Sequence, residues 1–350
     1  MSAPKATKGN FFEDFYLGQV IRHAVPRTIT TGDVALFSAL YGMRYPLQSS
    51  AAFARTCGLP GAPLDDMLVL HVVFGKTVPD ISLNAVANLG YAELTFGAPL
   101  YPGASVTADS QVIGLRENSN CKTGIVYVRS TGHDENDRVV VSFVRWVMVQ
   151  KRDPSAPAPQ TVVPELSSRV TPADLRIPDG FDAVGYDTVR AGSPHLWEDY
   201  TAGEWIDHID GMTVEEAEHQ TATRLYQNTA RGHFDALTQS ESRFGRRIVY
   251  GGHVMTLARS LAFNGLANAG FIAAINSGRH VSPVAAGDTI YAGTQVLETC
   301  DFAGQGALGA LRVRTLATRN VRAAAPDGDA LPEGAVLDVD WWLLMPRGDR

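Results

Sequence analysis

The sequence predicts an α+β protein built from two tandem copies of one unit, in which a long buried helix is enclosed by an antiparallel sheet. Three observations predict this fold. An internal repeat spans both halves of the chain, each half holds one apolar segment of helical length, and β-branched and aromatic strands follow each of these segments. A chain of 350 residues is also longer than a single typical core requires, so two domains are the natural expectation.

The internal repeat becomes visible when the segment beginning at Gly18 is aligned with the segment beginning at Gly203, because His23 then meets His208 and several apolar residues coincide. A second block, PLYPGASVTADSQVIG, parallels PVAAGDTIYAGTQVLE. The last strands of the two halves, VVVSFVRWVMV and AVLDVDWWLLM, correspond as well. Three matching blocks in the same order indicate a duplicated domain.

Each half has the same order of predicted elements. An amphipathic segment comes first, an apolar segment long enough for a buried helix comes second, and strands complete the half. In the first half the two helical segments are residues 33–41 and 64–76, and in the second half they are residues 215–228 and 251–266. The last two strands of the first half flank a polar turn at 133–137, which is typical of a hairpin.

A proline-rich stretch separates the two halves. Four prolines between residues 152 and 170 are incompatible with a regular helix or a central strand. We therefore predict an N-terminal domain over residues 1–151, a linker over 152–184 and a C-terminal domain over 185–350.

The composition narrows the class of protein. A net charge of −7 argues against nucleic acid as the main partner. The three cysteines are far apart and match no metal or redox spacing. The N-terminal segment lacks the apolar run of a signal peptide, and no stretch approaches the roughly 20 apolar residues that span a membrane. We expect a cytoplasmic protein that binds neither nucleic acid nor membrane.

The second half contains a group of residues typical of acid–base chemistry. Asn228 and His233 are five residues apart, and the turn Tyr250-Gly251-Gly252 directly precedes the apolar helical segment. A histidine can take and give a proton near neutral pH, and an amide can hold a water molecule. Glycine N–H groups at a helix N-terminus favour developing negative charge.

Each of these residues is commonplace when taken alone, since a lone histidine is usually structural and a Gly-Gly pair is usually a turn. The repeat adds a contrast. The positions aligned with Asn228 and His233 hold Met43 and Gln48, neither of which can do acid–base work. At most one half is therefore expected to be catalytic in this way, while the other keeps the fold and lends a surface to the ligand.

The pattern Asn228-x4-His233, followed by RRIVYGGHVM, resembles the signature of MaoC-like hydratases of the hot-dog fold. Longer strings resemble a narrower family, the mesaconyl-CoA hydratases, also called β-methylmalyl-CoA dehydratases. They include FGKTVPDISLNAVANLGYA, VIGLRENSN, VRWVMVQKRD and GRHVSP, and the similarity covers the chain from Phe11 to about Pro346. The resemblance implies a double hot-dog fold, that is, two tandem hot-dog domains with one long helix each.

The resemblance also implies a hydro-lyase that interconverts β-methylmalyl-CoA with mesaconyl-CoA and water, without a metal or an organic cofactor. Position by position, it places His233 at the catalytic histidine, Asn228 at an aspartate and Gly251 at the oxyanion-hole glycine. Asn228 departs from the wider signature, and an amide cannot serve as a base. We therefore expect His233 to be the only titrating member of the pair.

The implied partner is an acyl-CoA thioester with a free carboxylate, which demands a cation. Arginine suits bidentate carboxylate binding. Arg246 and Arg247, immediately before the glycine turn, are the preferred pair, and Arg259 is the next candidate because it lies just over two helical turns after Gly251. We expect Tyr250 and Gly252 to lie near the thioester and the chain to form a homodimer. Two further histidines, His253 and His280, could line the pocket, and buried hydrogen-bonded roles suit them equally well.

Three alternatives stay open on the sequence alone. An R-specific enoyl-CoA hydratase for simple acyl chains would have an apolar tunnel and no carboxylate-binding arginine. A hot-dog thioesterase would direct water at the carbonyl carbon without this Asn–His pair. A non-catalytic acyl-CoA-binding protein would bind the thioester without turnover.

Overall fold

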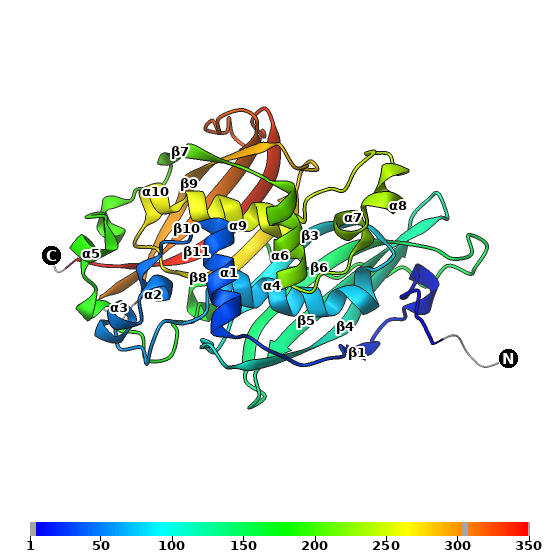
Figure 1. Cartoon of the computed structure of the whole chain (residues 1–350), viewed down its shortest axis with the longest axis horizontal. Helices are drawn as coiled ribbons and strands as arrows, with labels where there is room; N and C mark the ends of the chain where they lie inside the picture. Colours follow the sequence, from blue (N-terminus) through cyan, green and yellow to red (C-terminus); the bar gives the residue numbers. More distant parts are fainter. Residues whose placement is uncertain (1–4, 303–306, 349–350) are drawn as a thin grey trace.

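The computed structural model describes residues 5–302 and 307–348, and its main feature is an antiparallel sheet that extends through both halves (Figure 1). The strands of the first half are β1 (Val20–Arg22), β2 (Arg27–Thr28), β3 (Ala85–Phe96), β4 (Ser105–Glu117), β5 (Thr123–His133) and β6 (Val139–Gln150). Those of the second half are β7 (Trp205–Thr213), β8 (Phe271–His280), β9 (Thr289–Asp301), β10 (Leu308–Arg319) and β11 (Ala335–Pro346). The order across the sheet is β1-β4-β5-β6-β3-β8-β11-β10-β9-β7, with β2 beside β4.

The two halves meet where β3 pairs with β8. In this antiparallel pair Tyr91 lies opposite Gly278 and Thr95 lies opposite Ala274. Because the pair is hydrogen-bonded like any other in the sheet, the halves share one continuous surface. Side chains of β3, from the first half, therefore lie next to elements of the second half.

Two buried helices, one from each half, lie across the same face of this sheet (Figure 1). They are α4 (Asp66–Thr77) and α9 (Gly251–Leu261), and their side chains share a hydrophobic cluster. The prediction of a helix at 64–76 is confirmed, and the side chain of Asp65 caps α4 by accepting the N–H of Met67 at 2.8 Å. The fold is therefore the predicted α+β arrangement.

The second predicted buried helix is shorter than expected. α9 ends at Leu261, and a separate turn, α10 (Phe263–Leu266), follows it. The backbone of Asn264 is not helical, and Gly265 has a φ of 110°, so the helix cannot continue through them. The apolar pattern extends to residue 266 because Leu266 is buried, although Asn264 is exposed and the helix has ended before it.

The amphipathic segments also form helices. α1 (Thr31–Tyr41) matches its prediction, whereas α6 (Glu216–Leu225) ends three residues before the predicted residue 228. The chain turns there because Gln227 adopts a φ of 54°. The shorter helices are α2 (Pro46–Ser49), α3 (Ala51–Thr56), α5 (Thr188–Ala191), α7 (Arg231–Phe234), α8 (Ala236–Ser240), η1 (Phe12–Asp14), η2 (Val78–Ser82), η3 (Pro172–Asp174), η4 (Ala183–Gly185) and η5 (Trp197–Asp199).

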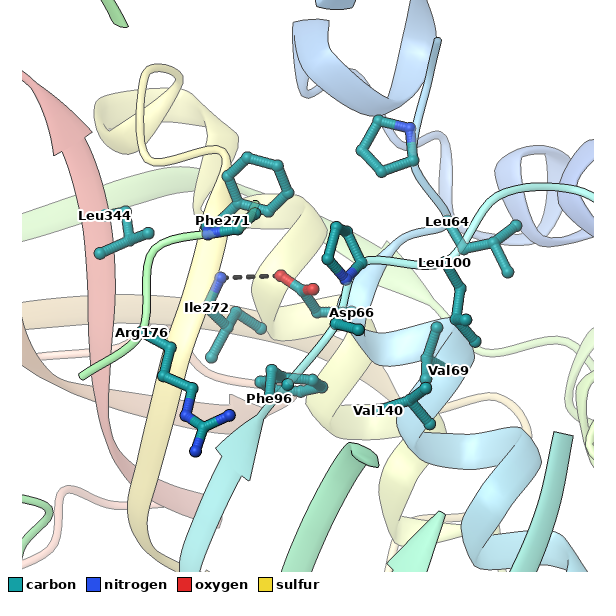
Figure 2. A pocket seen from close by; sticks show the side chains of 15 residues that line it. Leu64, Asp66, Val69, Phe96, Leu100, Val140, Arg176, Phe271, Ile272 and Leu344 are labelled. Atoms are coloured by element: carbon teal, nitrogen blue, oxygen red, sulfur yellow. Dashed lines mark hydrogen bonds between the residues drawn. The ribbon is translucent and has the colours of Figure 1, made fainter. Parts of the chain in front are cut away.

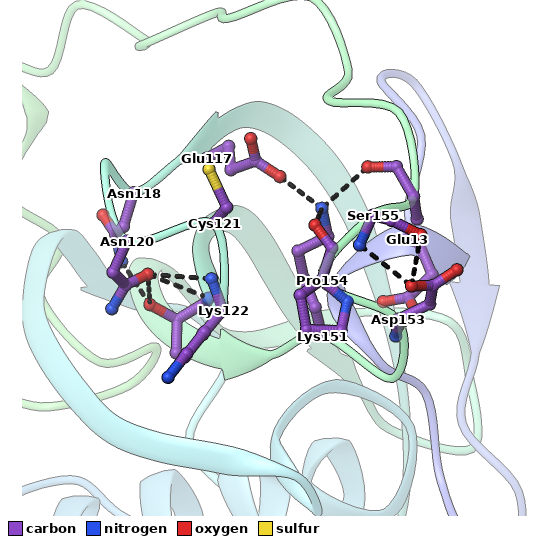
Figure 3. Close-up of polar contacts among 12 residues, drawn as sticks. Glu13, Glu117, Asn118, Asn120, Cys121, Lys122, Lys151, Asp153, Pro154 and Ser155 are labelled. Carbon is purple, nitrogen blue, oxygen red and sulfur yellow. Dashed lines mark hydrogen bonds and ion pairs between the residues drawn. The ribbon is translucent and has the colours of Figure 1, made fainter.

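The segment 152–184, all of it described, contains no α-helix, and its one β contact is an isolated bridge between Val162 and Leu115. Its start is tied to the first half (Figure 3). The buried ammonium of Lys151 donates to Glu117 at 2.5 Å and to the carbonyl of Pro154 at 3.3 Å. The segment thus has the irregular structure predicted for a linker, while the division at 151 and 184 stays a prediction.

No helix among the described residues is long and apolar enough to cross a membrane.

Candidate active site

His233 lies on the short helix α7, where its imidazole has one fixed nitrogen. Its Nδ1 lies 3.0 Å from the carbonyl oxygen of Ile248. Because a carbonyl only accepts, Nδ1 carries the proton and Nε2 keeps its lone pair. Burial lowers the pKa of His233 to about 4, although the bond to Ile248 acts in the opposite direction. The imidazole is therefore neutral near pH 7 and can accept a proton from water.

Asn228 is buried in the loop between α6 and α7. Its side-chain Oδ1 accepts a hydrogen bond from the backbone N–H of Ala230 at 3.1 Å, and its backbone N–H donates to the carbonyl of Thr223 at 3.0 Å. The hydrogen bond to Ala230 thereby fixes the orientation of the side chain, and its amide NH₂ is the donor that can meet a ligand or water. α6 is tied to α7 as well, because Gln220 donates to the carbonyl of His233.

A close backbone approach holds this loop against the first half. A Cβ added to Gly75 of α4 would lie 1.8 Å from the carbonyl oxygen of Tyr226. Only glycine permits that approach, so α4 packs directly on the backbone that leads to Asn228. The first half therefore helps to position the Asn228–His233 pair.

Gly251 and Gly252 form the start of α9, and both lie under histidine rings. A Cβ on Gly251 would lie 2.4 Å from Cε1 of His280, and a Cβ on Gly252 would lie 2.5 Å from Cε1 of His71. The first N–H groups of a helix have no intrahelical acceptor, and they carry the positive end of the helix dipole. The turn can therefore stabilise a negative oxygen that approaches it.

Tyr250 caps the same turn and joins the two halves. Its hydroxyl lies 3.1 Å from Nδ1 of His71, whose Nε2 lies 2.9 Å from the hydroxyl of Thr256. The Tyr250 ring centroid lies 5.7 Å from that of His233. Burial lowers the pKa of His71 to about 3, so this histidine is a neutral bridge. The expected contact of Tyr250 with a thioester stays a prediction.

Sequence reasoning missed the contribution of Tyr91, which comes from β3 of the first half. Its hydroxyl lies 3.2 Å from Nε2 of His280. Burial, and then the nearby His233, lower the pKa of His280 to about 4. His253 has a buried hydrogen-bonded role, since its Nδ1 lies 2.8 Å from the hydroxyl of Tyr41.

The three expected arginines each have a partner within the protein. Arg246 is exposed and donates to a backbone carbonyl, and Arg247 forms an ion pair with Glu216 at 2.7 Å. Arg259 is buried, with its guanidinium carbon 3.8 Å from the ring centroid of Tyr45. None of these contacts directs the guanidinium to His233, and the substrate-binding role of the three arginines stays a prediction.

A small cavity lies beside the N-terminus of α4, at the position of the first half that aligns with the glycine turn (Figure 2). Its volume of about 20 Å³ has room for about one water molecule and not for an acyl group. Asp66 points into it and accepts the N–H of Ile272 at 2.8 Å. The other labelled lining residues in Figure 2 are Leu64, Val69, Phe96, Leu100, Val140, Arg176, Phe271 and Leu344.

Comparison with known proteins gives a consistent result. The profile of the mesaconyl-CoA hydratase family matches residues 2–325. A β-methylmalyl-CoA dehydratase of Chloroflexus aurantiacus is 58% identical and aligns over 99% of either chain. A mesaconyl-CoA hydratase of Cereibacter sphaeroides is 54% identical, over 98% of this chain and 100% of the relative.

Solved structures agree with the sequence relatives. A MaoC domain protein of Chloroflexus aurantiacus superimposes with a TM-score of 0.95 at 57% identity, over 99% of this chain and 100% of the other. A Mycobacterium tuberculosis protein with a double hotdog fold gives a TM-score of 0.76 at 27% identity, over 97% and 99% of the two chains. The predicted double hot-dog fold is confirmed.

Proposed function

Because this chain belongs to the mesaconyl-CoA hydratase family, we propose that it catalyses the reversible hydration of mesaconyl-CoA (2-methylfumaryl-CoA) to β-methylmalyl-CoA. One observation carries the chemistry of this proposal. The neutral imidazole of His233, held through Nδ1 by a backbone carbonyl, lies near a helix N-terminus that begins at Gly251. His233 can thus act as the base that activates water, and the helix start at Gly251 can stabilise the developing oxyanion.

The proposed hydration begins with a water molecule held by the amide NH₂ of Asn228. Nε2 of His233 removes a proton from this water as its oxygen attacks the β-carbon of the enoyl thioester. The electron pair of the double bond moves toward the thioester, and the Gly251 N–H stabilises the resulting enolate oxygen. The protonated His233 then returns its proton to the α-carbon on the same face, and dehydration is the reverse.

The amide at position 228 fits this scheme. With Oδ1 bound to the N–H of Ala230, the NH₂ group donates to the water oxygen and leaves a lone pair for the attack. A second acid is not required, because one imidazole both takes and returns the proton. The proposal therefore assigns one titrating residue to the reaction, His233.

We also propose a cellular compartment, an oligomeric state and a partner for this protein. The cysteines Cys57, Cys121 and Cys300 are free thiols, which supports a reducing, cytoplasmic compartment. Exposed apolar residues at and before edge strand β1, Tyr16, Leu17 and Val20, support a homodimer. The proposed partner is an acyl-CoA thioester, and neither nucleic acid nor a membrane is part of the proposal.

The test is the ultraviolet absorbance of mesaconyl-CoA, with the thioester at C1, after the purified protein is added. A prompt fall in the conjugated enoyl-thioester band, with the mass of one water gained, is the expected result. Release of free CoA instead would indicate a thioesterase. Hydration of crotonyl-CoA with an unchanged mesaconyl-CoA band would indicate a simple-chain hydratase, and binding without turnover would indicate a non-catalytic protein.

A further inference from the structure

The proposed substrate carries its free carboxylate on the β-carbon, the atom that water attacks. A cation that binds this carboxylate must therefore lie beside the reaction centre and within the same buried space. Among the described residues, two arginine side chains are buried, Arg145 in β6 and Arg259 in α9. They differ in the groups that contact the guanidinium and in its position relative to the glycine turn.

Arg259, like Arg145, forms no ion pair with a carboxylate of the described residues. Its guanidinium donates to the carbonyl of Ala269 and lies over the Tyr45 ring, while its Nη1 is buried without a hydrogen-bond partner. It lies more than two turns beyond Gly251, toward the C-terminus of α9. This position, away from the glycine turn, favours a structural role for Arg259.

Arg145 forms no ion pair with a carboxylate of the described residues. Its Nη2 donates to the hydroxyl of Thr77 at 2.7 Å, its Nη1 lies 3.4 Å from the hydroxyl of Ser82, and its Nε is buried without a partner. Its guanidinium lies 4.3 Å from the ring centroid of Phe74. Burial lowers the pKa of Arg145 to about 10, so it stays charged at neutral pH. A buried charge without a counter-ion is costly, and proteins rarely keep one without a function.

The position of Arg145 is beside the candidate active site. In the sheet Arg145 lies opposite Tyr91, the residue whose hydroxyl meets His280 above the glycine turn. The Phe74 ring under Arg145 lies 5.6 Å from the ring of Tyr250. A series of aromatic contacts, from Phe74 to Tyr250 and from Tyr250 to His233, thus connects the Arg145 guanidinium with the His233 region.

Asn88 presents a second unpaired polar group on the same face. Both polar atoms of its side chain are buried without a hydrogen-bond partner among the described residues. Asn88 lies opposite Val147, and Tyr91 lies opposite Arg145. Because Arg145 and Val147 are two residues apart on one strand, Asn88 and Arg145 share the inner face of the sheet.

The second half shows that the fold does not need a charge at this position. The last strands of the halves align so that Arg145 corresponds to Trp341. Trp341 is fully buried, and its indole N–H donates to the hydroxyl of Thr315 at 3.0 Å. The same scaffold position thus holds a tryptophan with its N–H hydrogen-bonded in the second half, and an arginine with one N–H lacking a hydrogen-bond partner in the first half.

We propose that Arg145, assisted by Asn88, binds the free carboxylate of the substrate and so selects CoA monothioesters of dicarboxylic acids. This inference rests on the proposed function and deepens it. Selectivity is then supplied by β3 and β6 of the first half, whereas proton transfer is supplied by α7 and α9 of the second half. An Arg guanidinium is suited to this role because its fork matches a carboxylate with two parallel hydrogen bonds.

The test compares mesaconyl-CoA with tiglyl-CoA, which has the same carbon skeleton with a methyl group in place of the carboxylate. We expect Arg145→Met to lower kcat/KM for mesaconyl-CoA by about 10²-fold or more, because the buried carboxylate of the substrate loses the guanidinium that binds it. For tiglyl-CoA we expect a change of less than about tenfold, so the preference between the substrates collapses. Arg145→Lys keeps the charge without the fork, and the preference should fall by about tenfold.

The matched control is Lys151→Met, which removes another buried cation near the end of the same strand, where Glu117 is its partner. We expect lower stability and an unchanged preference. A folded Arg145→Met enzyme with the wild-type preference would overturn the inference, as would a collapse in Arg259→Met alone. If Arg145→Met does not fold, the preference of Arg145→Lys decides in the same way. Wild-type protein that fails to hydrate mesaconyl-CoA would instead overturn the proposed function itself.

Discussion

The two halves of the chain use the same internal hydrogen bonds to hold their first strands. In each half a histidine at the first strand meets a hydroxyl side chain of the neighbouring strand, which meets a hydroxyl of the next. In the first half the hydrogen-bonded series is His23–Ser110–Ser130, with donor–acceptor distances of 2.8 and 2.7 Å. In the second half it is His208–Thr294–Thr315, with 2.8 Å for both bonds. The repeat is therefore structural and extends to buried polar groups.

The halves differ around the N-terminus of the central helix. Gln48 takes the place of His233 and donates to the carbonyl of Gly270 at 2.8 Å, while Asp66 takes the place of Gly251. One half thus has the proposed proton-transfer group and a glycine at its helix start, and the other has an amide and a half-buried acid. The comparison teaches that the chemistry resides in a few positions on a scaffold that both halves share.

The strongest test of this difference is a pair of matched substitutions, His233→Ala and Gln48→Ala. Loss of the base should lower kcat for mesaconyl-CoA by about 10³-fold or more, because one group both removes and returns the proton. Gln48→Ala removes a structural hydrogen bond, and we expect kcat within a few-fold of wild type. Steady-state kinetics with circular dichroism on both variants checks this. Equal losses in the two variants would show that the halves are not functionally distinct.

The second test concerns the helix start and uses Gly251→Ala. The added Cβ would meet the His280 ring at 2.4 Å and displace the N–H from its position, so we expect kcat/KM to fall by about 10²-fold. Gly61→Ala, just before α4 in the first half, is the control because a Cβ there meets nothing within 4 Å. Wild-type activity in a folded Gly251→Ala variant would refute the oxyanion role.

Much of the architecture could be predicted because its signals are local. The apolar segment at 64–76 and the spacing of Asn228, His233 and Gly251 each depend on a short run of residues. The failure at residues 262–266 has the same origin, since the apolar pattern does not report the positive φ of Gly265 that prevents one continuous helix.

The contacts across the middle of the sheet could not be predicted in this way. The bond between Tyr91 and His280 depends on the register of β3 with β8, two strands that are distant in the sequence. Strand alternation indicates which face a side chain occupies but not its partner on another strand. For Arg145 a signal was available, because alternation places it on the same face as the apolar residues Phe143 and Val147. A charge on an apolar face marks a candidate site.

The pH profile sharpens the difference between the halves further. His233 must be unprotonated to act as a base, and its pKa is lowered to about 4 by burial. We expect kcat/KM to be flat near neutral pH and to fall tenfold per pH unit below an apparent pKa of about 4. Circular dichroism at each pH separates this limb from acid unfolding, and Gln48→Ala should give the same profile. A limb centred near pH 6.5 would contradict the assignment of His233 as a buried base.

The smallest expected effect belongs to the acid that the first half places at its helix start. Burial, and then the neighbouring Asp65, raise the pKa of Asp66 to about 8. Between about pH 4 and 8 the folded state keeps this proton while the unfolded state releases it, so stability falls as the pH rises, by at most about 1.4 kcal/mol per pH unit. Asp66→Asn should flatten the dependence of Tm on pH in that window and leave kcat unchanged.

Asp33 provides the control of opposite sign for this measurement. Hydrogen bonds from Thr30 and the nearby Arg27 outweigh the effect of burial and hold the pKa of Asp33 below its usual value. Its stabilisation is therefore present at neutral pH and is lost as the pH falls through the acid range. Asp33→Asn should leave the slope between pH 5 and 8 as in wild type. A slope that persists in Asp66→Asn would show that another group causes it, and would contradict the assignment of a protonated Asp66 at the start of the central helix of the first half.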